Sequence, residues 1–137
     1  ILHHEANRPL DRPMPPRYSR HYYDLYKMAA SPVKEKAFLQ LELLKRVVEF
    51  KMKFYPRGWA RYPDAKPGTM KLVPPTERGK ELEADYKKMR MMLYGDVPQF
   101  DTMMEGIQIY PTLCSNNLGD IQRLVQLSGI QHWTPAF

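Results

Sequence analysis

Three histidines and a glutamate near the N-terminus are the residues of this 137-residue chain whose types suggest metal binding. His3, His4 and Glu5 are adjacent, and His21 follows further along. Zinc-binding helices place two histidines four residues apart, and zinc fingers use CxxC pairs. Neither spacing is present, and adjacent histidines in a proline-rich stretch point in different directions. We therefore interpret these histidines as surface residues and predict no metal and no other cofactor.

Other catalytic chemistry finds equally little support. Cys114 is the single cysteine, so no intramolecular disulfide is possible, and no histidine lies near it in sequence to generate a thiolate. The chain lacks GxxxxGK[ST] and GxGxxG, and the glycines of 57–68 are too far apart to cradle a phosphate. Glu81 and Asp85 lie on a mixed-charge helical face. The sequence predicts a protein that is not an enzyme and has no small-molecule substrate.

Arginine alternates with aromatic residues in "RYSRHYY" at 17–23 and "YPRGWARY" at 55–62. Such surfaces stack on RNA bases, but Tyr, Trp and Arg are also the usual anchors of protein–protein interfaces. Because the C-terminal half is net acidic, we favour protein partners, with rRNA and lipid headgroups as alternatives. The predicted partner-binding residues are Arg17, Tyr18, Arg20, Tyr22, Tyr55, Arg57, Trp59, Arg61, Tyr62, Trp133 and Phe137.

The positive charge is local. The chain carries a net +6, and residues 45–72 contain eight Lys or Arg against two acids, whereas residues 73–137 contain six against eight. Electrostatic attraction should therefore act at the region from Lys45 to Lys71, which we expect to meet protein, a membrane surface or rRNA.

Hydrophobic periodicity predicts an all-α fold with two main helices and two shorter ones, at about 32–54, 76–94, 18–30 and 116–129. Ser31 and Pro32 form a helix start, and Gly95 forms a helix stop. Leu82, Tyr86, Met89 and Leu93 are the predicted buried stripe of the 76–94 helix. A short helix is also expected around 101–106, with an extended piece after it. The 32–54 helix carries two adjacent apolar stripes, a face wider than one neighbouring helix covers.

The prolines suggest the domain organisation. Four of them predict an extended N-terminal arm at 1–17, ahead of one small helical domain at 18–129. Five prolines in 55–75 predict an extended contact loop that a partner orders. The apolar and aromatic residues of 130–137 predict a docking tail.

These features together suggest a function class. The sequence has no apolar run of 18 residues, so no membrane span is expected. The first residue, Ile1, is compatible with removal of a targeting presequence. We predict a non-catalytic accessory subunit of a large organellar assembly, with a mitochondrial respiratory-chain complex as first choice, in the matrix or on the matrix-facing side of the inner membrane. Its partners would be the other protein subunits. A mitochondrial ribosomal protein that contacts rRNA through residues 45–72 is the alternative, and a small enzyme with an unrecognised site ranks third.

Overall fold

The computed structural model describes residues 1–38 and 40–113, which form helices and connecting turns without a β-strand. The prediction of an all-α fold is confirmed. In chain order the helices are α1 (Leu2–Ala6), α2 (Arg20–Ala29), α3 (Val33–Phe38), α4 (Leu41–Phe54), α5 (Gly79–Met89) and α6 (Phe100–Leu113). Short 3-10 turns lie at η1 (Gly58–Ala60), η2 (Tyr62–Asp64), η3 (Thr76–Arg78) and η4 (Arg90–Met92). No helix in the described ranges is long and apolar enough to cross a bilayer.

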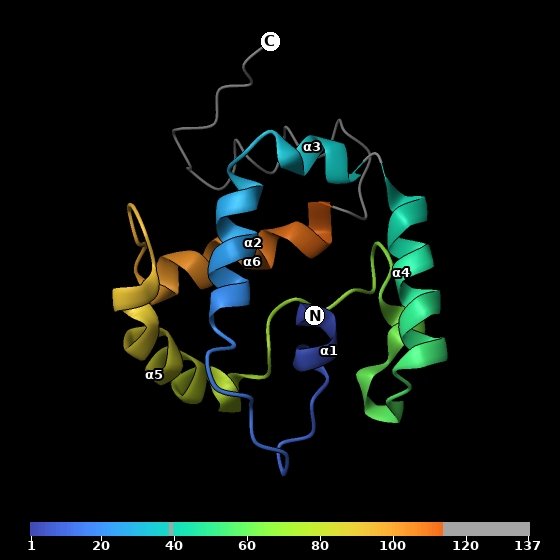
Figure 1. The fold of residues 1–137 in the computed structure, drawn as a ribbon, viewed down its shortest axis with the longest axis horizontal. Coiled ribbons are helices and arrows are strands. Elements are labelled where there is room, and N and C mark those ends of the chain that lie inside the picture. The colour runs from blue at the N-terminus through green and yellow to red at the C-terminus, as the bar shows by residue number, and fades with distance from the viewer. Residues whose placement is uncertain (39, 114–137) are drawn as a thin grey trace.

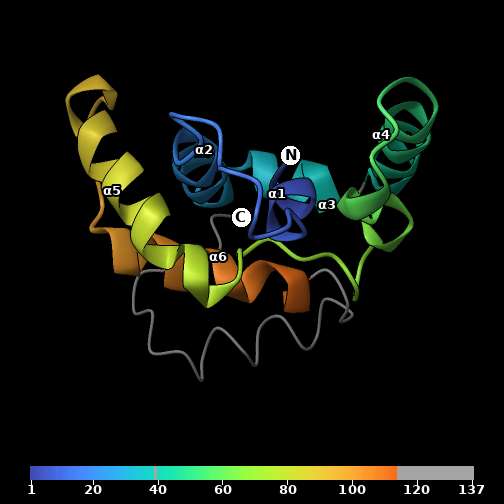
Figure 2. The ribbon, with the colours of Figure 1, turned by 90° about the horizontal axis from the view of Figure 1, so that it is seen from below.

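The helices form a central group with one helix on either flank. Figure 1 shows α1 and α2 in the middle, α5 on one side and α4 on the other. Seen from below in Figure 2, α6 crosses under α2, while α4 and α5 rise as two separate arms. The arrangement leaves α5 packed into the centre and α4 beside a hollow.

The hydrophobic core lies where α1, α2, α5 and α6 meet. On α5 the predicted stripe residues Leu82, Tyr86 and Met89 are buried, and the Tyr86 hydroxyl donates a hydrogen bond of 2.9 Å to the carbonyl of Pro98. Burying one such side chain contributes about 1.5–3 kcal/mol, so this cluster dominates the stability. The core cluster consists of Leu2, Tyr22, Leu82, Tyr86, Met103 and Ile107.

Asp85 on α5 fixes the start of α2. Its carboxylate accepts hydrogen bonds from the backbone N–H of Arg17 at 2.7 Å and of Ser19 at 2.9 Å, and from the Ser19 hydroxyl at 2.6 Å. Burial alone would raise the pKa of Asp85, but the bonds from Ser19 and Arg17 outweigh it and hold the pKa below its ordinary value. The backbone immediately before α2 is thus held by a side chain from a distant helix.

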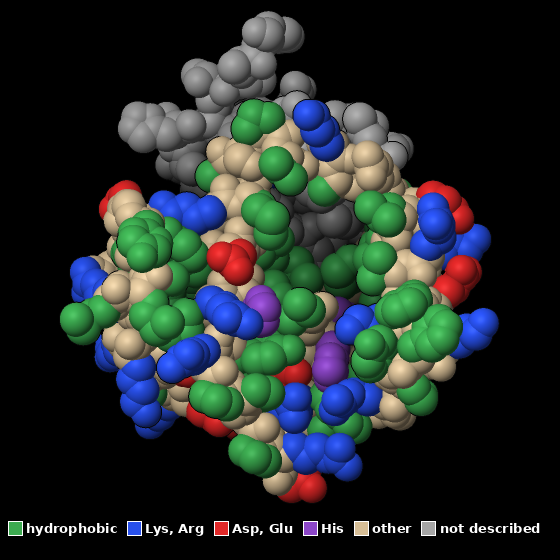
Figure 3. Space-filling model, viewed as in Figure 1, with side chains coloured by type: hydrophobic (Ala, Val, Ile, Leu, Met, Phe, Trp, Pro, Cys, Tyr) green, Lys and Arg blue, Asp and Glu red, His purple; other side chains and the backbone are tan. Residues whose placement is uncertain are grey.

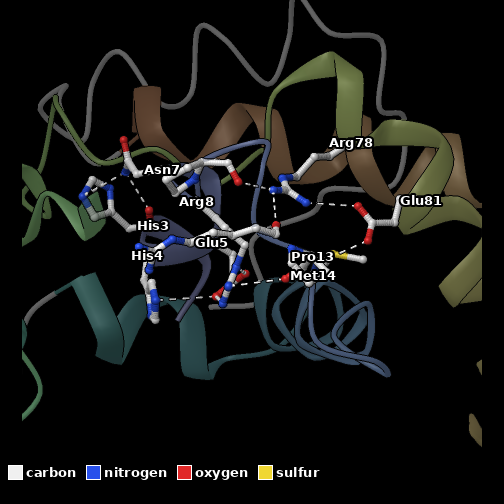
Figure 4. Close-up of polar contacts among 11 residues, drawn as sticks. His3, His4, Glu5, Asn7, Arg8, Pro13, Met14, Arg78 and Glu81 are labelled. Carbon is white, nitrogen blue, oxygen red and sulfur yellow. Dashed lines mark hydrogen bonds and ion pairs between the residues drawn. The ribbon is translucent and has the colours of Figure 1, made fainter. Parts of the chain in front are cut away.

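Arg78 holds the connection between α1 and α2. Its side chain is 4% exposed and donates to the carbonyls of Pro9 at 2.5 Å and Arg12 at 2.6 Å, and to the Glu81 carboxylate at 3.0 Å. Figure 4 shows the guanidinium between Glu81 and this N-terminal connection. One buried cation therefore orders a proline-rich stretch that makes few backbone hydrogen bonds of its own.

The N-terminal arm differs from the prediction. Residues 1–17 were expected to be extended, but they begin with α1, in which Leu2, His3, Glu5 and Ala6 are buried. The prolines that disfavour helix start only at Pro9, so they leave the first residues free to form a helical turn. The arm is part of the folded unit.

Three helix boundaries also differ, and the first is the predicted stop at Gly95, because α5 ends at Met89, η4 follows at Arg90–Met92 and Leu93 is already extended. The expected 32–54 helix is divided into α3 and α4, because Gln40 leaves helical geometry at φ −113° and ψ 46°. The Ser31 hydroxyl accepts a hydrogen bond of 3.3 Å from the Val33 N–H, which agrees with the predicted helix start. The extended piece expected after residue 106 is wrong, since α6 continues to Leu113 and fully buries Ile107. The predicted helix at 116–129 and tail at 130–137 lie outside the described residues.

The 55–75 segment packs against α1 of its own chain. Ala60 and Tyr62 are 0% and 8% exposed. His3 donates through Nε2 to the Arg61 carbonyl at 2.9 Å and accepts at Nδ1 from the Lys71 N–H at 3.0 Å. The expectation that a partner orders this segment is wrong, because a buried histidine ties both halves of it together.

Candidate functional site

A cavity of about 370 Å³ lies between α1, α2, α4 and residues 62–72. Small-molecule sites are typically clefts of roughly 300–1,000 Å³ with apolar walls and a few polar groups. Figure 3 shows the surface hollowed between the α2 and α4 sides, with apolar side chains around the hollow and histidines near it. Its apolar walls include Leu25, Met28, Leu44, Val48, Met70 and Leu72.

Polar side chains enter the cavity from opposite sides. His21 and Asp24 lie three residues apart on α2, and Lys51 lies on α4. Burial, with the Arg20 charge, lowers the pKa of His21, so its imidazole is neutral near pH 7. The cavity therefore offers an ammonium, a carboxylate and a neutral imidazole, which suit a ligand that carries both negative charge and hydrogen-bond donors.

His4 connects the cavity to an aromatic cluster behind it. Its ring packs against Trp59 with centroids 4.5 Å apart and an angle of 44° between the ring planes. Burial lowers the pKa of His4 to about 4, and the nearby Arg57 and Arg8 act in the same direction although Glu5 opposes them. His4 is thus uncharged and serves as a flat wall instead of a cation.

Three arginines surround Trp59. The guanidinium carbons of Arg8, Arg57 and Arg12 lie 4.9, 5.8 and 5.9 Å from the centre of its ring, within cation–π range. Arg8 is neutralised by Glu5 through hydrogen bonds of 2.6 and 2.8 Å, drawn in Figure 4. Burial would raise the pKa of Glu5, but Arg8 outweighs it and the pKa is lowered. The surface around Trp59 keeps an excess of positive charge from Arg12 and Arg57.

A metal centre is not formed by the residues that the structure describes, where no group of three His, Cys, Asp or Glu side chains is arranged to bind an ion. His3, one of the metal candidates in the sequence, uses both ring nitrogens in hydrogen bonds to backbone. Its role is to position the cavity wall.

The predicted partner-binding residues are dispersed. Tyr22 is 1% exposed in the core and Tyr62 lines the cavity wall, so both have internal packing roles and the prediction is wrong for them. Tyr18 is half-buried against His21 at 4.8 Å between ring centroids, and burial raises its pKa to about 12. Trp59 is half-buried within the arginine cluster, and Trp133 and Phe137 lie outside the described residues. Partner binding stays a prediction for five exposed residues: Arg17, Arg20, Tyr55, Arg57 and Arg61.

The polar residues of the cavity were missed in the sequence. Asp24 was assigned no role, Lys51 was considered only as part of the positive region from Lys45 to Lys71, and His21 was interpreted as a surface residue. The spacing of His21 and Asp24 on one face of α2 was a signal available in the sequence. The approach of Lys51 was not visible in the sequence, since it depends on how α4 is placed relative to α2.

Comparison with protein families gives one match, and it includes the residues that line the cavity. Residues 1–106 match the family described as "Nucleotidyl transferase AbiEii toxin, Type IV TA system". The match covers 106 of the 137 residues, including every residue that lines the cavity. No curated protein and no solved structure matches the chain.

This match overturns the functional predictions. A nucleotidyltransferase toxin is an enzyme that acts on nucleotides, so the predictions of a non-catalytic chain without a small-molecule substrate are wrong. A toxin–antitoxin system is not an organellar assembly, which contradicts the respiratory-chain and mitoribosomal assignments, the large-complex partners and the mitochondrial localisation. Composition misled because stiff proline-rich segments and a basic helix also occur in a chain that orders them internally.

The family match covers most of the helices that form the hydrophobic core. The matched region begins with α1 and ends within α6, so it contains α1, α2, α5 and the first part of α6, with every residue of the core cluster except Ile107. The chain belongs to the AbiEii family of nucleotidyl transferase toxins of type IV toxin–antitoxin systems.

Proposed function

We propose that this chain acts as a nucleotidyltransferase toxin and that the cavity between α2 and α4 binds its nucleotide substrate. The observation that carries the proposal is the coincidence of the family match with the residues that line the cavity. In this reaction an acceptor oxygen forms a bond to the α-phosphorus of a nucleoside triphosphate, the acceptor loses its proton, and pyrophosphate leaves.

The cavity chemistry supports nucleotide binding. Its apolar walls suit a base, which gains from burial against Leu25, Met28 and Leu72. The Asp24 carboxylate is suited to accept hydrogen bonds from sugar hydroxyls or an exocyclic amine, and the Lys51 ammonium to attract phosphate.

Binding can be measured by calorimetric titration of the purified protein with each of the four ribonucleoside triphosphates. Lys51→Gln should weaken the preferred triphosphate about tenfold or more, because a charged contact to phosphate contributes at least about 1.4 kcal/mol. Lys80→Gln, at an exposed position of α5 away from the cavity, is the matched control and should bind as the parent protein does.

Transfer is tested separately with α-³²P-labelled triphosphates and a mixture of cellular RNA and protein acceptors. Labelled product should form with the parent protein and decrease with Asp24→Asn, whereas Asp101→Asn at an exposed position of α6 should leave it unchanged. Absence of both triphosphate binding and labelled product would refute the proposal. Equal losses in Lys51→Gln and Lys80→Gln would refute the placement of the nucleotide in this cavity.

A further inference from the structure

An apolar stripe on α4 is uncovered in the part of the chain that the structure describes. Leu43, Val47, Phe50 and Phe54 follow a 4-3-4 spacing and are 51%, 47%, 50% and 56% exposed. None of the 14 residues of α4 is buried by the described residues. A helix normally buries such a stripe against a neighbour, so an exposed one marks an interaction surface.

The C-terminal end of this stripe is an aromatic cluster. The rings of Phe50 and Phe54 lie 4.7 Å apart, and Phe50 and Tyr55 lie 6.0 Å apart, with Tyr55 54% exposed. Val47 sits at the border between the stripe and the cavity, while Leu44 and Lys51 turn toward the cavity. The stripe is thus a second surface, distinct from the proposed nucleotide site.

Basic side chains flank the stripe. In the heptad numbering set by the 4-3-4 spacing, Arg46 and Lys53 occupy one flanking register and Lys51 the other. Glu42 and Glu49 lie further round the helix, where Glu42 pairs with Lys45 at 3.8 Å. Within the described residues no ion pair is formed by Arg46, Lys51 or Lys53. The seam is apolar along its centre and carries Arg46 and Lys53 along one edge, because Lys51 on the other edge turns toward the cavity.

We propose that this face binds an acidic amphipathic helix of a partner protein. The partner helix places its apolar side on Leu43, Val47, Phe50 and Phe54 and its carboxylates against the flanking cations. The interaction goes beyond the proposed function, since Leu43, Phe50 and Phe54 do not line the cavity.

Other occupants fit the charge pattern less well. In an antiparallel pair formed with a second copy, Arg46 would face Lys53 of the other chain, and like charges across a seam repel. The chain's own residues 114–137 contain one Asp and one Arg, and so lack the acidic complement.

Two synthetic helical peptides with the same leucine seam test the proposal. One carries Glu at all flanking positions and the other Lys, and each is labelled for fluorescence anisotropy with the full-length protein at low salt. The Glu peptide should bind at least about tenfold more tightly than the Lys peptide, given the value of several charge pairs at a seam. Arg46→Glu combined with Lys53→Glu should reverse this preference, and both positions are exposed, so the fold should persist.

Phe50→Ser should abolish binding of the Glu peptide, and Met91→Ser, at a side chain 98% exposed elsewhere on the surface, should not. Equal affinity for the two peptides, or no affinity for either, would overturn the proposal. It would also be overturned if Phe50→Ser instead released the protein from phosphatidylglycerol vesicles or converted a dimer to a monomer in sedimentation velocity, which would identify lipid or a second copy as the occupant.

Discussion

Helices α4 and α5 occupy opposite flanks of the molecule and differ in how much of their apolar surface is buried. Both are amphipathic, yet α5 buries Leu82, Tyr86 and Met89, whereas no residue of α4 is buried by the described part of the chain. The difference lies in their neighbours: α5 packs into the group formed by α1, α2 and α6, and α4 borders a cavity. An apolar stripe in a sequence predicts a helix face, and the surrounding chain decides whether that face becomes core or a binding surface.

Polar contacts follow the same division. Arg78 and Asp85 join α5 and its preceding turn to residues 68 or 69 positions earlier in the chain. On α4 the ion pair found among the described residues is local, between Lys45 and Glu42. Stability should therefore concentrate around α5, and α4 should be the element that opens most easily. Binding surfaces are commonly drawn from such elements.

The largest effect should come from the core side of this comparison. Leu82→Ala removes a fully buried side chain and should lower the free energy of unfolding by about 3–5 kcal/mol. Leu43→Ala on α4 removes a half-exposed side chain of the same type and should cost less than about 1 kcal/mol. Urea unfolding followed by circular dichroism measures both. Equal losses would show that α4 belongs to the same cooperative core.

Arg78 should rank next. Arg78→Leu removes the donors to Pro9 and Arg12 and leaves two carbonyls without their partner, at a cost of roughly 2–3 kcal/mol. Lys80→Leu, at an exposed position two residues along, is the matched control and should change stability by less than about 0.5 kcal/mol. Hydrogen exchange of residues 9–14 should rise in the first variant alone.

Asp85 should contribute a smaller, pH-dependent amount. Asp85→Asn weakens the charged cap of α2 and should cost about 1 kcal/mol at neutral pH. Since folding lowers the pKa of Asp85, its contribution is present above the unfolded value of about 4 and is lost as the pH falls through the folded value. The gap between parent and variant should close in acid. A gap that stays constant with pH would mean that the charge is not the cause.

The smallest effect is expected on the stripe itself. Phe50→Ser should lower stability by less than about 1 kcal/mol because half of the ring already faces solvent. A loss as large as that of Leu82→Ala would place Phe50 in a core and remove the contrast between the two helices. Thermal unfolding of the two variants side by side decides between these outcomes.

Much of the fold could be predicted from local signals. The stripe of Leu82, Tyr86 and Met89 and the helix start at Ser31 depend on periodicity and backbone preference that the sequence displays. The five-residue α1 could not be predicted, since it is too short to show a helical period of apolar residues. Its order comes from Glu5 pairing with Arg8 and from His3 bonding to residues far along the chain.

The candidate site could not be predicted from the sequence either, because it also depends on contacts between distant segments. Prolines in 55–75 restrict backbone angles but do not say which surface the segment packs on. The cavity requires Asp24, Lys51 and Leu72 to converge from three separate segments, and no motif marks any of them. Charge was correctly located in residues 45–72, and its interpretation as an organellar contact failed because many kinds of partner share that electrostatic signal.

The hydrogen bonds that Arg78 and Asp85 make to residues 9–19 affect when this part of the chain can fold during synthesis. The N-terminal connection emerges from the ribosome first, but the side chains that hold it are made almost seventy residues later. Until α5 has left the exit tunnel, residues 9–19 lack the side chains that fix them, and α2 has no cap. The nascent chain can therefore fix the connection between α1 and α2 only after α5 has been synthesised.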